Sequence, residues 1–277
     1  MSKPGALRVS PQTGAARGTD KMAVKTLSTP WLGRFKPNPQ AQLRLFCFPY
    51  AGGGTLAFRG WAENLPAGVE ICPVQLPGRE HRMREPALTS IPVIVEAAAE
   101  ALAPHLDKPF AFFGHSMGAL ISFDLARTLR DRHGITPVRL FVSGCRAPHL
   151  KRKRPPTYNL SEAEFVHELR SLNGTPRELL DSPDLMRLLL PLLRADFEAS
   201  ETYAYVPGAP LDCPIHAFGG TDDPEVDRRE IREWCEQTVA EFSLKMFPGD
   251  HFFLHSARPL LLDALAQQLR QIVTTQI

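Results

Sequence analysis

The segment that most constrains this 277-residue chain is Gly114-His-Ser-Met-Gly118, in which a serine stands between two glycines. An apolar run at 110–113 precedes it, and a helix-forming stretch at 119–126 follows it. A strand that turns directly into a helix holds the residue at the tip of the turn in a strained backbone conformation. The flanking glycines remove Cβ atoms that would clash there. We therefore expect Ser116 to project from the end of a strand.

Short apolar runs alternate with helix-forming stretches along much of the chain. Strands are expected at 43–48, 69–74, 110–113, 139–142, 215–218 and 242–247. Helices are expected at 58–65, 92–102, 117–132, 227–239 and 257–272. Strands without a polar face are typical of parallel sheets that are covered on both sides. The pattern predicts an α/β fold with a mostly parallel central sheet and helices on both faces.

Residues 151–210 interrupt this alternation. They contain helix-like stretches at 161–171 and 183–200, and the first opens with a capping-box pattern, Ser161-Glu-Ala-Glu164. A helical insertion between two strands of an open α/β sheet is expected over the carboxyl ends of the strands, where such sheets bind ligands. We predict a helical lid at 151–210 above a core formed by 31–150 and 211–277. A helical layer without a gating role is the alternative.

The positive charge of the chain is concentrated near its start. The net charge is only +2, which indicates no nucleic-acid partner, and residues 1–30 are expected to form a disordered basic arm. No apolar run is long enough for a membrane span, and the first residues lack the apolar region of a secretory signal. Five cysteines without a CxxC pair fit reduced thiols. We therefore expect a cytoplasmic protein.

A serine hydroxyl needs a neighbouring base before it can attack a carbonyl group. The strand–Gly-x-Ser-x-Gly–helix arrangement is the nucleophile turn of the α/β-hydrolase fold, in which the acid and then the histidine follow the serine. His251 lies between a strand and the last helix, so we predict it as general base, with His255 as the alternative. The N–H of Met117 opens a helix beside Ser116 and is predicted to stabilise an oxyanion.

The acid that orients the histidine is expected in the loop after a late strand. The loop after 139–142 contains no carboxylate, whereas Gly219-Gly-Thr-Asp-Asp-Pro224 follows the strand at 215–218. The acid is therefore Asp222 or Asp223, and spacing alone does not separate them. Its role would be to hold the histidine tautomer and to stabilise the imidazolium.

A glycine-rich loop, Pro49-Tyr-Ala-Gly-Gly-Gly54, follows the first strand. Its glycines allow the backbone to approach a substrate, so the loop is expected to supply a second oxyanion donor. Phosphate binding is the alternative, but the Lys-Ser/Thr of a P-loop is missing. No His/Cys cluster has the spacing of a metal site, and the predicted chemistry needs no cofactor.

Five segments together resemble the type II thioesterases, the stand-alone editing thioesterases of nonribosomal peptide and polyketide synthases. They are Phe48–Gly54, Val74–Glu80, Phe113–Ala119, Phe218–Pro224 and Phe247–Phe253, in the order found in the family. The resemblance implies an α/β-hydrolase fold. It also implies hydrolysis of acyl or aminoacyl thioesters from the phosphopantetheine arm of an acyl-carrier or peptidyl-carrier protein.

The resemblance also implies roles for single residues. The family's Gly-x-x-Asp pattern matches Gly220-Thr-Asp-Asp223 and favours Asp223 as the acid, and Ala51 corresponds to the first oxyanion donor. Arg79 and Glu80 match a family motif, and we expect them to form only a turn-stabilising ion pair.

The basic run Lys151-Arg-Lys-Arg154 is either a docking point for an acidic carrier protein or a solvated loop.

Two other functions compete with editing of carrier proteins. A carboxylesterase, or a thioesterase acting on acyl-CoA or medium-chain acyl carriers, would use the same triad. A non-catalytic partner that only binds carrier proteins is the other, and the intact serine, aspartate and histidine argue against it.

Overall fold

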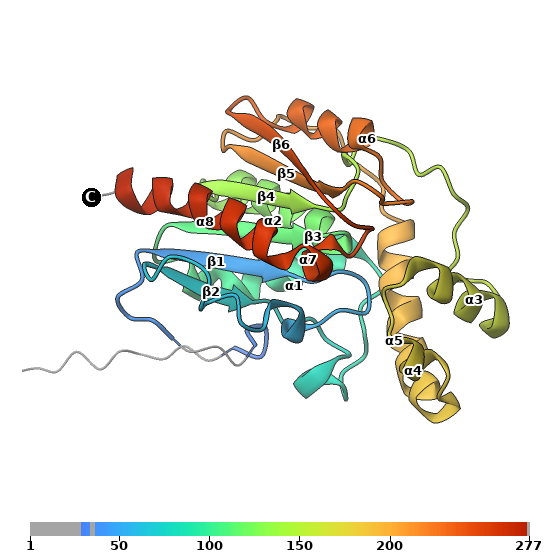
Figure 1. Cartoon of the computed structure of the whole chain (residues 1–277). Coiled ribbons are helices and arrows are strands. Elements are labelled where there is room, and N and C mark those ends of the chain that lie inside the picture. The colour runs from blue at the N-terminus through green and yellow to red at the C-terminus, as the bar shows by residue number, and fades with distance from the viewer. Residues whose placement is uncertain (1–28, 34–36, 276–277) are drawn as a thin grey trace, which may run out of the picture.

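The computed structural model describes residues 29–33 and 37–275. Within them, one parallel sheet has the strand order β2-β1-β3-β4-β5-β6 (Figure 1). The strands are β1 (Leu43–Phe48), β2 (Val69–Pro73), β3 (Phe110–His115), β4 (Arg139–Ser143), β5 (Ile215–Gly220) and β6 (Phe242–Phe247). The predicted strands and their parallel arrangement are confirmed. The predicted basic arm at 1–30 lies almost wholly outside the described residues.

Alternate side chains of the strands enter two different apolar cores. On β1, Phe46 faces the core shared with α1 (Ile91–Leu102) and α2 (Met117–His133), whereas Leu45 faces the core shared with α8 (Arg258–Thr275). Burial of one such side chain contributes about 1.5–3 kcal/mol. Figure 1 shows α8 across one face of the sheet and α1 and α2 behind it. Both faces are therefore covered, as the apolar strands predicted.

The helical insertion of residues 151–210 contains α3 (Glu162–Leu172), α4 (Arg177–Leu180) and α5 (Pro183–Glu201). The predicted capping box is present, because the Glu164 N–H bonds the Ser161 hydroxyl while the Glu164 carboxylate accepts the Ser161 N–H. The helices share a small apolar core of Phe165, Leu169, Leu180, Met186, Leu190 and Leu193. The insertion projects beyond the carboxyl ends of the strands (Figure 1), and its role as a lid stays a prediction.

The helix predicted at 58–65 is wrong. The chain forms only a short 3₁₀ helix, η1 (Thr55–Phe58), and Gly60 then adopts a φ of 77°. This left-handed conformation ends any helix, and it lets Trp61 pack edge-on against Phe113 at 4.9 Å between ring centroids. Packing of the aromatic side chains therefore outweighs the local helix preference.

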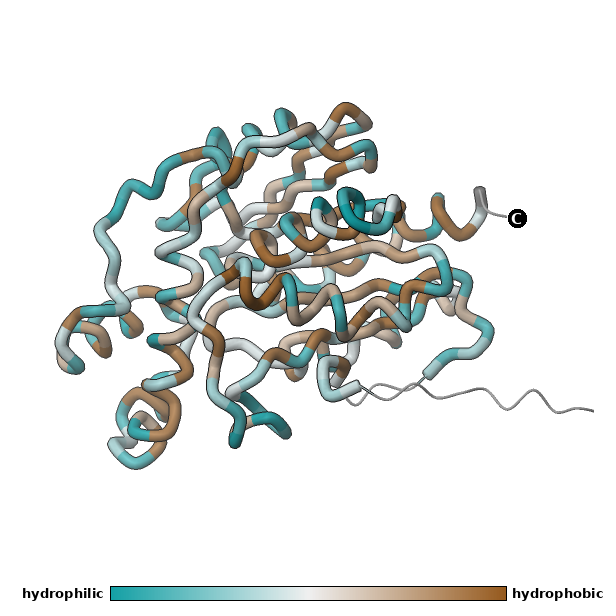
Figure 2. The backbone as a smooth tube through the Cα atoms, turned by 180° about the vertical axis from the view of Figure 1, so that it is seen from behind, coloured by the Kyte–Doolittle hydropathy of each residue, from teal (hydrophilic) through white to brown (hydrophobic). Residues whose placement is uncertain are grey.

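The helix predicted at 227–239 is divided into α6 (Arg228–Arg232) and the 3₁₀ helix η4 (Glu233–Gln237). Short helical turns not expected from the sequence form η2 (Glu80–Arg82), η3 (Ala103–His105) and α7 (Phe253–Ser256). None of the described helices is both long and apolar enough to cross a lipid bilayer. Figure 2 shows that hydrophilic residues gather in the outer loops.

A buried histidine of β5 makes the stability of the sheet sensitive to acid. His216 stacks on Phe141 with 5.5 Å between ring centroids, and burial is the main cause that lowers its pKa from 6.5 to about 4. Between these values the unfolded chain binds a proton that the folded chain excludes. The contribution of neutral His216 to stability is therefore complete above pH 6.5 and is lost as the pH falls towards 4.

We expect His216→Phe to keep the stack on Phe141 while reducing the loss of stability on acidification. Between pH 7 and pH 5, urea unfolding should show a loss in the free energy of unfolding that is smaller than in the wild type by about 2 kcal/mol. His133→Gln, at an exposed position, serves as the control and should behave as the wild type. An unchanged pH dependence in His216→Phe would contradict the assignment.

Candidate active site

Ser116 occupies the tight turn between β3 and α2. Its φ of 54° and ψ of −117° are outside the regions that residues with a side chain normally adopt. A Cβ on Gly114 would lie 2.2 Å from the Gly118 carbonyl oxygen, and a Cβ on Gly118 would lie 2.2 Å from that of Phe48. The two glycines therefore allow the turn, as predicted, and the serine stands at the carboxyl end of β3.

His251 and Asp223 come from the turns that follow β6 and β5. The Nδ1 of His251 lies 2.8 Å from Oδ2 of Asp223, whose side chain is completely buried. The other oxygen of Asp223 accepts the N–H groups of Glu225 and Val226 at 2.8 and 3.2 Å. These bonds fix the carboxylate and aim it at one nitrogen of the imidazole ring, so that Nε2 is left for other partners.

The two alternatives left by the sequence, Asp222 and His255, have other neighbours. Asp222 is exposed and accepts the Thr221 hydroxyl at 2.9 Å. The Nε2 of His255 lies 2.9 Å from the Tyr50 hydroxyl, beside the glycine-rich loop. The structure therefore brings Asp223, and not Asp222, to His251.

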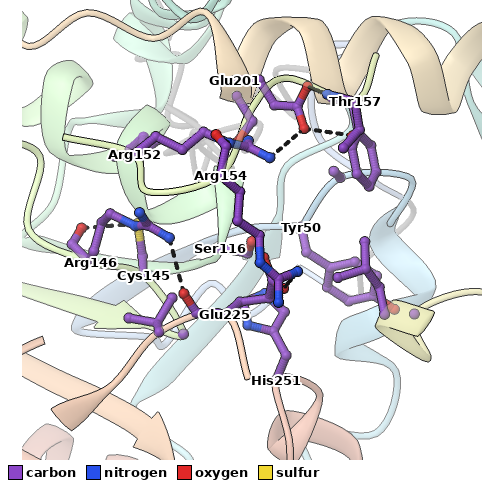
Figure 3. A pocket seen from close by; sticks show the side chains of 18 of the residues that line it. Tyr50, Ser116, Cys145, Arg146, Arg152, Arg154, Thr157, Glu201, Glu225 and His251 are labelled. Atoms are coloured by element: carbon purple, nitrogen blue, oxygen red, sulfur yellow. Dashed lines mark hydrogen bonds and ion pairs between the residues drawn. The ribbon is translucent and has the colours of Figure 1, made fainter. Parts of the chain in front are cut away.

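Ser116 and His251 line one cavity of about 210 Å³, together with Tyr50 and Ala51 (Figure 3). Among the described residues, no hydrogen bond joins the Ser116 hydroxyl to His251. In sites without substrate such bonds are often long and tighten only when the reacting molecule is bound. Met117 is the first residue of α2, so its N–H has no acceptor within the helix and is available to an oxyanion.

His115, the residue before the serine, packs beneath the site. Its ring centroid lies 5.3 Å from that of His251, and its Nδ1 lies 2.9 Å from the Ser143 hydroxyl oxygen. Burial, and then the neighbouring His251, lowers the pKa of His115 well below its usual value. His115 therefore remains uncharged at neutral pH and adds no competing positive charge beneath His251.

The cavity wall combines apolar surface with ion pairs. Its apolar lining includes Leu120, Leu150, Leu169, Leu172, Leu193 and Phe197. Arg152 pairs with Glu201 at 2.7 Å, and Arg154 pairs with Glu225 (Figure 3). Sequence reasoning missed these residues as parts of the cavity, because each pair joins segments that are far apart along the chain.

Arg79 forms an ion pair, but the expected pairing within its own turn is wrong. Its guanidinium binds both carboxylate oxygens of Asp196 on α5, each at 2.7 Å. Glu80 instead accepts the Leu56 N–H at 3.1 Å and the Thr55 hydroxyl. The turn is therefore tied to two other segments, to α5 through Arg79 and to the start of η1 through Glu80.

One cluster outside the cavity has the residue types of a metal site. His149, Glu233 and Glu236 place possible ligand atoms within 4.8 Å of one another. The Nδ1 of His149 already lies 2.9 Å from the Gln237 side-chain nitrogen, and its Nε2 lies 3.4 Å from Glu236. Contacts within the chain account for this arrangement, so we assign no metal to it.

A parallel sheet with a serine at the strand–helix turn, and a histidine and an aspartate from later loops at the same edge, defines a serine hydrolase of the α/β-hydrolase fold. A family model described as "Thioesterase domain" matches residues 43–272. The chain therefore belongs to the thioesterase family.

Similar proteins narrow this assignment to the type II thioesterases. "Gramicidin S biosynthesis protein GrsT" from Aneurinibacillus migulanus is 47% identical over 89% of this chain and 96% of its own length. "Thioesterase PikA5" from Streptomyces venezuelae is 42% identical over 81% and 80%. The structure of the type II thioesterase BorB from the borrelidin biosynthetic cluster is 39% identical, covers 88% of this chain and 99% of BorB, and superposes with a TM-score of 0.80.

The two adjacent aspartates allow a matched test of the site. Asp223→Asn should lower kcat by about 10³- to 10⁴-fold, because the amide no longer holds the required tautomer of His251. Asp222→Asn should change kcat by no more than a few-fold, since that side chain is exposed and accepts the Thr221 hydroxyl and, at 3.4 Å, the Gly249 N–H, rather than a nitrogen of His251. Hydrolysis of a p-nitrophenyl ester measures both. Equal losses in the two variants would refute the pairing of Asp223 with His251.

Proposed function

We propose that this thioesterase hydrolyses acyl or aminoacyl groups from the phosphopantetheine arm of acyl-carrier or peptidyl-carrier proteins, with Ser116, His251 and Asp223 as its triad. One arrangement carries the proposal: Ser116 and His251 line the same cavity, and buried Asp223 bonds the far side of the imidazole. GrsT is named as a protein of gramicidin S biosynthesis, and BorB as a type II thioesterase of the borrelidin biosynthetic cluster. We infer the carrier-bound substrate of this chain from its likeness to these relatives.

The proposed reaction is two successive acyl transfers. The Nε2 of His251 takes the proton of Ser116 as Oγ attacks the thioester carbonyl. The N–H groups of Met117 and Ala51 stabilise the oxyanion, and each such donor contributes about 10²-fold to the rate. The protonated imidazole then gives its proton to the departing pantetheine sulfur. A water molecule, deprotonated by His251, releases the acid and restores the serine hydroxyl.

The size of the cavity favours small acyl groups. Its volume of about 210 Å³ lies below the roughly 300–1,000 Å³ that is common for drug-sized ligands. Leu169 and Leu172 of α3 and Leu193 of α5 bring the helical insertion into the wall, so a longer chain would have to displace it. We infer that short acyl or aminoacyl groups are hydrolysed faster than medium-chain fatty acyl groups.

The basic run Lys151–Arg154 supports carrier docking only weakly. Arg152 and Arg154 pair with Glu201 and Glu225 in the cavity wall, and Lys153 lies 3.0 Å from Glu230. Charges that are neutralised within the chain contribute little to attraction of an acidic partner.

The cysteines, all of which are free, agree with the reducing cytoplasm that we propose as the location.

Mass spectrometry of acyl-loaded carrier proteins tests the function directly. The wild type should release the acyl group and leave the free phosphopantetheine thiol on the carrier. Ser116→Ala should leave the loaded carrier unchanged, because no hydroxyl is present to attack the thioester. A Ser116→Ala protein that still unloads the carrier would refute the proposed nucleophile.

The choice of substrate separates the proposal from its rivals. Turnover of acyl-carrier protein, acyl-CoA and a p-nitrophenyl ester with the same short acyl group should be highest, as kcat/KM, for the carrier. Higher kcat/KM on the ester would indicate a carboxylesterase. A preference for medium-chain acyl groups over acetyl on every donor would contradict the inference drawn from the cavity.

A further inference from the structure

A buried ion pair joins the helical insertion to the glycine-rich loop beside Ser116. Asp196 lies on α5 with its side chain fully buried, and Arg79 lies in the turn after β2 with only 4% of its side chain exposed. The two residues are 117 positions apart. The pair therefore links α5 to the turn after β2, two segments that lie far apart along the chain.

The side chains of this pair bond to each other, to the glycine-rich loop and to the turn that carries Arg79. Oδ2 of Asp196 accepts the Gly52 N–H at 2.7 Å and one Arg79 nitrogen at 2.7 Å, while Oδ1 accepts the other. The nitrogen that bonds Oδ2 also donates to the Gly53 carbonyl at 2.9 Å. Asp196 and Arg79 thus hold one donor and one acceptor of two consecutive residues, Gly52 and Gly53, directly after Ala51.

A steric contact reinforces the polar one. Gly52 has a φ of 77°, and a Cβ there would lie 2.5 Å from Cδ2 of Leu193. Leu193 and Asp196 are three residues apart on α5 and so lie on the same side of the helix. Leu193 also lines the cavity, so the same face of α5 forms part of the cavity wall and contacts the glycine-rich loop.

We propose that Asp196, on the helical insertion, and its partner Arg79 are positioning residues that fix the orientation of the Ala51 N–H in the oxyanion hole. The inference rests on the catalytic role proposed for Ser116 and Ala51. A carboxylate that accepts a backbone N–H in a buried site restricts the peptide planes around it more tightly than water would. The insertion is then part of the catalytic apparatus, because movement of α5 changes the orientation of the loop that carries Ala51.

The test uses a fluorophosphonate probe, which needs no knowledge of the natural acyl group. The Ser116 oxygen bonds to phosphorus, fluoride leaves, His251 takes the serine proton, and the phosphoryl oxygen occupies the oxyanion hole. Asp196→Asn should slow labelling by about 10-fold or more, because one amide oxygen cannot serve Gly52 and both Arg79 nitrogens. On a thioester, kcat should fall in parallel while KM stays within about 3-fold, since only the transition state needs the donor.

Two further variants control the measurement. Asp181→Asn removes a surface ion pair with Arg170 in the same insertion and should leave the labelling rate unchanged. Arg79→Lys keeps the positive charge but not the two-pronged contact, so it should slow labelling even if Asp196→Asn fails to fold. Thermal unfolding of each variant checks that it remains folded at the assay temperature.

The outcomes separate this inference from the proposed function. Wild-type labelling rates in folded Asp196→Asn and Arg79→Lys, whatever their melting temperatures, would show that the pair is only structural and overturn the positioning role. An equal slowing in Asp181→Asn would do the same, because the effect would then be general to the insertion. A wild-type protein whose Ser116 is not labelled would refute the proposed nucleophile itself.

Discussion

Backbone contact at the carboxyl ends of β1 and β3 is the constraint on which the site depends. Phe48 of β1 and Gly114 of β3 are partners in the sheet, and Gly118 packs directly against the Phe48 carbonyl. No side chain fits in these contacts, so the serine turn and the glycine-rich loop leave the sheet side by side. Because all neighbouring strands are parallel, the turns after β5 and β6 reach the same edge and bring Asp223 and His251 with them.

The helical insertion depends on the core that it covers. Its own apolar cluster is small, and its longest helix is anchored at the glycine-rich loop by Asp196 and Leu193. Removing one partner from a buried ion pair such as Arg79–Asp196 typically costs about 3–5 kcal/mol, because the other charge is left without a partner. An ion pair of this kind is poorly suited to frequent opening. The pair therefore resists movement of α5 away from the glycine-rich loop.

Local features were predicted well because their causes are local. The capping box at Ser161 and the close approach of Gly114 to Gly118 each follow from contacts within a few residues. The helix at 58–65 was predicted wrongly because burial of Trp61 and the φ of Gly60 decide that segment, and neither can be read from helix preference. The ion pair of Arg79 was placed in its own turn, since nothing in the sequence marks Asp196 as its partner.

The sequence by itself determined the α/β class, the glycine-flanked serine turn at 116 and the histidine that follows the last strand, because apolar strands and glycine-bounded turns can be recognised from neighbouring residues. Tertiary structure decided which of two adjacent aspartates meets His251, since only the packing of the turn after β5 against the turn after β6 places Asp223 at the imidazole and Asp222 at the Gly249 N–H. It also decided that a carboxylate of α5 holds the loop of Ala51. That contact exists only because folding brings together segments more than a hundred residues apart, where no local rule applies.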